Sequence, residues 1–216
     1  MSGLGARLTL SALLAIAPAL AYAASEHQAD TSASTRAEAF RQVSFGELLG
    51  VASSPALTFP VAIPSHYRER RSANSARGGL VWAAPVDWNL IRQGRAASGR
   101  HGMLVVERSK SLRFDAKRRE FRDGTGMSER NLAERLARHG AREVVIRRLD
   151  RDGMPMLLIE TELERGEHLR VLYVQLGQRT RVLTYIGQTP WSTADEVVWG
   201  RVRDAIAAAV TDTMPR

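Results

Sequence analysis

The chain has 216 residues, with 31 lysines and arginines against 23 aspartates and glutamates, and its formal net charge is +8. It contains no cysteine, which excludes stabilisation by disulfides and a lipid anchor attached through an N-terminal cysteine. Hydrophobic residues make up 44% of the chain, enough for the core of one domain of ordinary size, so packing has to supply the stability.

The first 23 residues have the pattern of a secretory signal peptide. Arg7 adds a positive charge, Leu8–Leu20 is apolar, and Ala21-Tyr22-Ala23 places small residues at the two positions that a signal peptidase reads. The alternative is a membrane anchor, but a helix over the apolar run would rise only about 20 Å, short of the roughly 30 Å hydrocarbon core. We therefore expect cleavage after Ala23 and a free periplasmic protein or one that is secreted further, most simply from a Gram-negative bacterium.

Residues 24–50 are expected to form a lead-in to a single domain over residues 51–216. The stretch 24–34 is polar and small, which is typical of disorder. A short helix capped by Thr35 is predicted over Arg36–Leu49, because apolar residues of this stretch fall near one helical face. These residues are Ala37, Phe40, Val43 and Leu48.

The globular pattern begins with a strand at Leu57–Pro64. Pro60 has no backbone N–H to donate, so we expect an edge strand or a bulged strand here. Arg68–Gly79 is charged and contains glycine, which is typical of a loop. Two further strands are expected at Leu80–Trp82 and Met103–Glu107.

The second half of the chain gives a helix, four strands and a final helix. Ser128 is a good N-cap for a helix over Glu129–His139. The strands that follow are separated by tight-turn signals, which make them antiparallel neighbours. They are Glu143–Leu149, Pro155–Leu163, His168–Leu176 and Arg179–Ile186. The third strand is apolar on both faces, so both must be covered, and a helix from Ser192 or Thr193 to about Val210 supplies one cover.

These elements predict an α+β fold, in which an antiparallel sheet with a C-terminal four-strand meander is flanked by helices. Three sequence features accompany this order: the run I-P-x-x-Y at Ile63–Tyr67, the exit strand Val182-Leu183-Thr184-Tyr185, and Trp199 with Ile206 on the final helix. On these features, Leu57–Val210 resembles the PsbP-like superfamily, in which a sheet is sandwiched between helices.

The resemblance implies a fold and little chemistry. Members of the superfamily include photosystem assembly subunits, periplasmic proteins of the DcrB type and secretion chaperones, and most bind or help to assemble other proteins. The resemblance implies no catalytic residue. DcrB-type proteins are commonly lipid-anchored, and this chain departs from them because it has no cysteine.

One candidate anion site lies where Asp123–Ser128 runs into a helix N-terminus. Glycines at such a place can cradle an anion on free backbone N–H groups. The candidate anion-binding residues are Gly124, Thr125, Gly126 and Ser128. The alternative is an ordinary loop with a serine cap, since the run lacks the pattern of a phosphate-binding P-loop.

Two basic clusters are candidate binding surfaces. The first consists of Arg68, Arg70 and Arg71, and the second of Lys117, Arg118, Arg119 and Arg122. The second is interleaved with Phe114 and Phe121, and such a mixture can hold an acidic surface. The alternative is a solvated hairpin or loop whose aromatic side chains turn inward.

Signals of catalysis and of metal binding are weak. Glu160, Glu162 and Glu164 share one face of a strand, which favours a solvated strand edge over a pair of glycosidase carboxylates. Arginines on neighbouring strands are expected to pair with them: Arg147, Arg148 and Arg170. No two of the five histidines have metal-ligand spacing, so neither a metal nor another cofactor is expected.

The sequence therefore predicts an exported, non-catalytic protein that binds or helps to assemble another envelope protein. One alternative is a peripheral binder of anionic lipid or lipopolysaccharide through the arginine clusters, and another is a hydrolase with an unrecognised site. The excess of arginine fits a polyanionic partner, but it also fits codon usage in a GC-rich genome. No nucleic-acid partner is expected, because the periplasm contains little nucleic acid.

Overall fold

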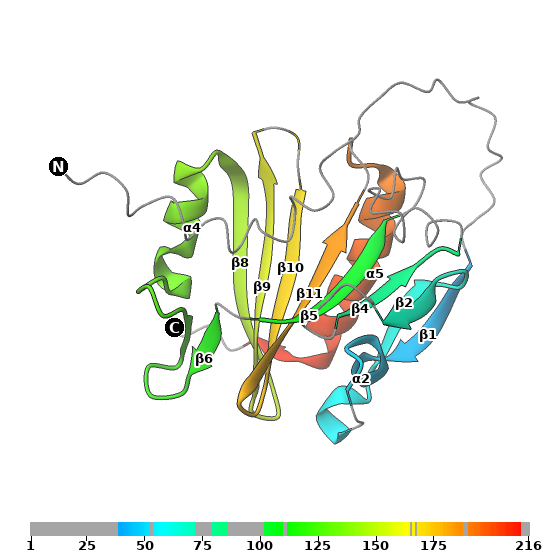
Figure 1. Ribbon diagram of the computed structural model, residues 1–216, viewed down its shortest axis with the longest axis horizontal. Helices are drawn as coiled ribbons and strands as arrows, with labels where there is room; N and C mark the ends of the chain where they lie inside the picture. Colours follow the sequence, from blue (N-terminus) through cyan, green and yellow to red (C-terminus); the bar gives the residue numbers. More distant parts are fainter. Residues whose placement is uncertain are drawn as a thin grey trace.

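Figure 1 shows a computed structural model of the chain. The structure describes residues 39–51, 54–71, 79–85, 102–109, 112–164, 166, 168–187 and 190–212. The predicted signal peptide, its cleavage site after Ala23 and the predicted disordered stretch 24–34 lie outside these residues.

Eight antiparallel strands form the main sheet, in the order β12-β8-β9-β10-β11-β5-β4-β3 (Figure 1). The bounds are β3 Arg68–Arg71, β4 Leu80–Ala83, β5 Met103–Arg108, β8 Ala141–Arg151, β9 Met154–Leu163, β10 His168–Leu176, β11 Arg179–Ile186 and β12 Thr211–Asp212. The predicted meander of four strands is confirmed as β8 to β11. Its first turn is Asp152-Gly153, where both residues have positive φ, the geometry of a two-residue hairpin that this dipeptide favours.

The two long helices lie where the sequence predicts them. Helix α4 covers Glu129–Arg138, and α5 covers Thr193–Ala209. Of the two expected caps of α5, Ser192 is the one used, because its hydroxyl accepts a hydrogen bond from the Asp195 N–H at 3.2 Å. No helix in the described part of the chain is both long and apolar enough to cross a membrane.

The N-terminal part of the domain differs from the prediction. The helix expected over Arg36–Leu49 is instead strand β1 (Phe40–Ser44) followed by the one-turn helix α2 (Phe45–Leu48). Strand β1 pairs with β2 (Pro60–Pro64) in a separate two-stranded sheet, and the 3-10 turn η1 (Pro55–Leu57) precedes β2. Pairing with a distant strand outweighs the local helical pattern. Pro60 begins β2, which has only this one partner, so the expectation of an edge strand is confirmed.

The predicted loop at Arg68–Gly79 is also wrong in its first part, because Arg68–Arg71 forms β3, the last strand of the main sheet. All four residues of β3 are exposed. A strand this polar has no apolar alternation to identify it from the sequence.

The main sheet is covered on both faces, as the apolar pattern of β10 predicted. Leu172 and Val174 of β10 join the larger core, to which α5, α2 and the β1-β2 sheet contribute. Val171 and Tyr173 face the other way, into a second core. That core is closed by α4 and by a hairpin of strands β6 (Arg113–Asp115) and β7 (Glu120–Arg122).

Candidate functional site

The second basic cluster lies on the β6-β7 hairpin. Phe114 and Phe121 are opposite each other in the hairpin register, and their rings meet edge to face with centroids 5.4 Å apart. Phe121 is 0% exposed and belongs to the second core. The aromatic residues therefore turn inward, as the hairpin interpretation of this segment expects, and the cations are left on the outside.

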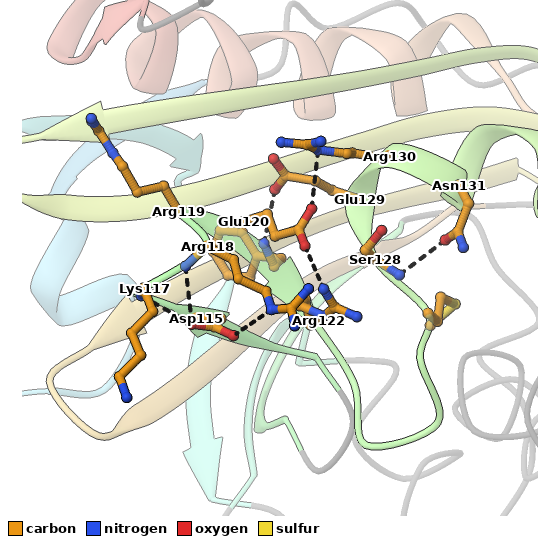
Figure 2. Close-up of polar contacts among 12 residues, drawn as sticks. Asp115, Lys117, Arg118, Arg119, Glu120, Arg122, Ser128, Glu129, Arg130 and Asn131 are labelled. Atoms are coloured by element: carbon orange, nitrogen blue, oxygen red, sulfur yellow. Dashed lines mark hydrogen bonds and ion pairs between the residues drawn. The ribbon is translucent and has the colours of Figure 1, made fainter.

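The end of the hairpin carries three consecutive exposed cations, Lys117, Arg118 and Arg119, which we call the basic tip. The Asp115 carboxylate accepts hydrogen bonds from the backbone N–H groups of Lys117 at 3.0 Å and Arg118 at 3.2 Å, and this fixes the turn (Figure 2). Arg119 has φ +52°, in the left-handed region that favours glycine. An arginine in this conformation costs on the order of 1 kcal/mol of conformational free energy.

A buried carboxylate stabilises the hairpin through ion pairs. Glu120 is 5% exposed, and its carboxylate lies 2.8 Å from the Arg122 guanidinium and 3.2 Å from that of Arg130 (Figure 2). A carboxylate removed from water is stable only beside such compensating charge. Arg122 is therefore engaged in an ion pair with a buried carboxylate, whereas the ion pair at the basic tip, between Arg118 and Asp115, is exposed.

A second carboxylate joins the hairpin to α4 and to the main sheet. Glu129, in the first turn of α4, accepts a hydrogen bond from the Phe121 N–H at 3.0 Å and lies 2.8 Å from the Arg148 guanidinium of β8. Arg148 also donates to the backbone carbonyl of Arg119. On the neighbouring side, the Phe114 N–H donates to the Gln175 side chain of β10 at 3.1 Å. The backbone of the basic tip is thereby fixed on the body of the domain.

In the predicted anion site over Asp123–Ser128, side chains of the protein itself occupy the N–H groups of Thr125, Met127 and Ser128, which favours the alternative of an ordinary loop. The Asp123 carboxylate accepts the N–H groups of Thr125 at 2.9 Å and Met127 at 2.8 Å, together with the Thr125 hydroxyl. The Ser128 N–H donates to the Asn131 side chain at 2.9 Å (Figure 2). The carboxylate of Asp123 takes the place of an external anion, and Gly124 and Gly126 shape this closed loop.

The first basic cluster, Arg68, Arg70 and Arg71, lies on β3, far from the hairpin. The basic tip contacts β8 through the Arg119 carbonyl, and five strands lie between β8 and β3. At about 4.8 Å per strand, the separation from β8 to β3 is roughly 29 Å. The structure therefore does not combine the two predicted clusters into one surface. The three arginines cover an open sheet edge, a position where charge prevents pairing with another chain.

Of the three glutamates predicted to form a solvated strand edge, Glu160 is buried, Glu162 is partly buried, and Glu164 is exposed and follows the end of β9. Strand β9 is an interior strand of the sheet, and the side chain of Glu160 is 9% exposed. Its carboxylate accepts a hydrogen bond from the Trp199 indole N–H and lies 3.7 Å from the Arg203 guanidinium. The expected pairing with arginines of β8 and β10 is also wrong for Arg148, which pairs with Glu129, and for Arg170, which donates to the Thr161 carbonyl at 2.9 Å. Among the described residues, no group of three or more His, Cys, Asp or Glu side chains is placed to hold a metal ion.

The sequence did not reveal the residues that support the basic tip. The sequence places Glu129 at the start of a predicted helix, and it does not connect Glu129, Arg130 or Arg148 with the hairpin. The separations in sequence explain this, because Arg148 lies 29 positions from the Arg119 carbonyl that it contacts. The one available signal was Phe121, an apolar residue within a run of charge that required a buried contact.

No protein-family model matches the chain, and comparisons with curated proteins and with solved structures likewise give no match.

Proposed function

We propose that the protein is an exported, non-catalytic binding protein, and that the basic tip binds an acidic surface of another envelope protein. The observation that carries this proposal is that Lys117, Arg118 and Arg119 have exposed side chains on a backbone held by Asp115, Glu129 and Arg148. A loop fixed before binding loses less conformational entropy when the complex forms, so more of the interaction free energy appears as affinity.

The charge of the basic tip is only weakly neutralised. Among the ion pairs of the described residues, one involves the basic tip: the Arg118 guanidinium lies 3.8 Å from the Asp115 carboxylate, and both side chains are well exposed to solvent. An exposed pair of this kind contributes little free energy and exchanges readily for an intermolecular pair. Arg122 is excluded from the proposed surface, since releasing it would leave the buried Glu120 with less compensating charge.

We further infer that the fold is PsbP-like. The order of elements supports this inference, because α4 and α5 lie on opposite faces of an antiparallel sheet and four consecutive strands form its centre (Figure 1). The sequence features at Ile63–Tyr67 and Val182–Tyr185 fall on β2 with the turn after it and on β11. A role in binding or assembling other proteins, in the periplasm, is consistent with this kinship.

The test compares two variants that remove the same charge. In the first, Lys117, Arg118 and Arg119 are all changed to Gln; in the second, the control, Arg68, Arg70 and Arg71 are all changed to Gln. Binding of the purified full chain to a poly-glutamate peptide is measured at low and at moderate salt. We expect the tip variant to lose affinity by roughly tenfold or more, the control variant to stay near the parent, and the parent to weaken as salt rises.

Two outcomes would contradict the proposal. An equal loss in both variants would mean that net charge alone is responsible for binding. Tip-dependent binding to vesicles of phosphatidylglycerol, without binding to the acidic peptide, would favour the peripheral lipid binder instead. Capture from periplasmic extract, with the parent retaining a protein that the tip variant does not retain, then identifies the partner.

A further inference from the structure

Three arginines that the sequence did not single out lie together on one face of the main sheet. Arg108 ends β5, and Arg179 begins β11 two residues before Arg181. In the sheet register, Arg181 is directly opposite Arg108. We call Arg108, Arg179 and Arg181 the arginine triplet.

The register places all three side chains on the same face. Leu183 and Tyr185 of β11, and Leu104 and Val106 of β5, belong to the larger core. Because side chains alternate along a strand, the residues of the triplet have the same parity as these core residues and face the same side. Opposite residues on paired strands have Cβ atoms about 5 Å apart, and residues two apart on one strand are separated by about 7 Å. Three guanidinium groups can therefore reach one small ligand.

No acidic partner compensates this charge in the part of the chain that the structure describes. The ion pairs there join other residues, and no hydrogen bond is formed by a guanidinium group of the triplet. The nearest carboxylate along the chain, Glu107, points to the opposite face of β5. Burial, together with the charges of Arg108 and Arg179, lowers the pKa of Arg181 from its ordinary value.

Like charges placed directly opposite each other on paired strands destabilise a sheet. Here the unfavourable pair is Arg181 and Arg108, and Arg179 adds a third positive charge. A bound anion would attract all three guanidinium groups and so offset their mutual repulsion.

We propose that the arginine triplet is a binding site for a phosphate group. Each guanidinium offers a planar fork of N–H donors that matches carboxylate and phosphate oxygens. A carboxylate offers two oxygens and one negative charge, too few acceptors for three forks. A phosphate monoester or inorganic phosphate offers at least three oxygens and close to two negative charges at neutral pH, which suits a site of three cations.

This site goes beyond the proposed function, because it does not use the basic tip. Gln175 of β10, which accepts the Phe114 N–H of the hairpin, also accepts the Thr180 hydroxyl at 2.7 Å. Thr180 lies between Arg179 and Arg181 and therefore faces away from them. The hairpin and the arginine triplet are thus on opposite faces of the sheet, and a variant of one leaves the other in place.

The test uses Arg181→Gln, with Arg147→Gln as the matched control, because Arg147 is an exposed arginine of β8. Thermal unfolding of the purified full chain is followed in sodium phosphate and in sodium chloride of equal ionic strength. We expect phosphate to raise the Tm of the parent and of Arg147→Gln, and to have no such effect on Arg181→Gln. In chloride alone, we expect Arg181→Gln to melt at or above the Tm of the parent, because like-charge repulsion is removed.

A second measurement locates the site directly. The Nε–H signals of the arginine side chains are followed by NMR while inorganic phosphate is added, and those of the triplet should shift together with one dissociation constant. Equal shifts at all exposed arginines, or equal Tm gains for both variants, would overturn the proposal. A lower Tm of Arg181→Gln in chloride would also overturn it, since that result belongs to a structural arginine.

The source of the phosphate group is distinguished with vesicles. Binding to vesicles that contain phosphatidic acid, whose phosphate is a monoester, supports a lipid headgroup as the ligand if it is lost in Arg181→Gln and competed by inorganic phosphate. Phosphate binding without vesicle binding supports a soluble phosphate compound. Absence of both in the parent rejects the site.

Discussion

The β6-β7 hairpin and the arginine triplet both concentrate arginine, but they differ in what surrounds the charge. At the hairpin, Arg122 of β7 lies 2.8 Å from the Glu120 carboxylate, and Arg148 of the neighbouring β8 lies 2.8 Å from the Glu129 carboxylate. In the triplet, Arg181 faces Arg108 across the strand pair. The first arrangement stabilises the fold, and the second costs free energy until an anion binds.

This difference shows why a count of charged residues is a poor guide to a binding surface. The second basic cluster is conspicuous in the sequence because its cations are consecutive, yet one of its four, Arg122, is consumed by an internal ion pair. The arginine triplet is inconspicuous because Arg108 is 73 residues away from its opposite residue Arg181, as their numbers show. Partners, and not density along the chain, decide which cations are available to a ligand.

The largest expected effect comes from removing the apolar anchor of the hairpin. Phe121→Ala leaves a cavity in the second core, and it should lower the free energy of unfolding by about 3–5 kcal/mol, measured by urea denaturation. It should also weaken binding to poly-glutamate, because the basic tip is no longer held. Phosphate binding at the triplet should persist in the protein that remains folded.

Phe114→Ala is the matched control for this change. Phe114 is half-buried and meets Phe121 edge to face, so its loss should cost less than the loss of Phe121. Equal costs for the two variants would show that the hairpin is not anchored mainly through Phe121.

A smaller effect, of opposite sign in the two regions, is expected from a pair of arginine substitutions. Arg122→Gln removes a cation from the buried Glu120 carboxylate and should lower the free energy of unfolding by about 1 kcal/mol, since Arg130 still compensates in part. Arg179→Gln removes a like charge from the triplet and should raise it by a few tenths of a kcal/mol, on the order of a surface charge pair. Urea denaturation in phosphate-free buffer measures both. Changes of the same sign would remove the distinction between the two regions.

The parts of the fold that could be predicted are those fixed by local chemistry. The Asp152-Gly153 turn, the Ser128 cap and the two-faced apolar pattern of β10 each act over a few residues. From these signals the sequence predicts the meander, helix α4 and the cover on both faces of the sheet.

The parts that failed depend on pairing across long separations. Strand β1 is a strand because Val43 lies opposite Val61, and β3 is a strand because Arg70 lies opposite Val81. Glu160 is buried because Trp199, 39 residues later, donates to it. In the candidate anion loop, the competing partner is local: the carboxylate of Asp123, within the motif itself, accepts the N–H groups of Thr125 and Met127.

Arg170, which forms no hydrogen bond to a carboxylate among the described residues, gives the smallest and most specific prediction. Arg170 donates to the carbonyls of Thr161 at 2.9 Å and Leu169 at 3.2 Å, and it lies over the Trp191 ring, on which His168 also stacks. Burial, and then the charge of Arg170, lower the pKa of His168 below its ordinary value of 6.5, although three carboxylates oppose this shift. These are Glu162, Asp195 and Glu196.

The sign of the pH dependence follows from this lowered pKa. The unfolded chain takes up a proton at His168 near pH 6.5, whereas the folded protein resists protonation until a lower pH. The contribution of His168 to stability is therefore fully present above pH 6.5 and is lost as the pH falls toward the folded pKa. Arg170→Met should raise the folded pKa without restoring it fully, because burial remains the larger cause, and Arg147→Met should leave it unchanged. NMR titration of the imidazole measures this pKa directly. An unchanged pKa in Arg170→Met would show that the charge of Arg170 is screened from His168. The charges of the arginine triplet, by contrast, are inferred to repel one another.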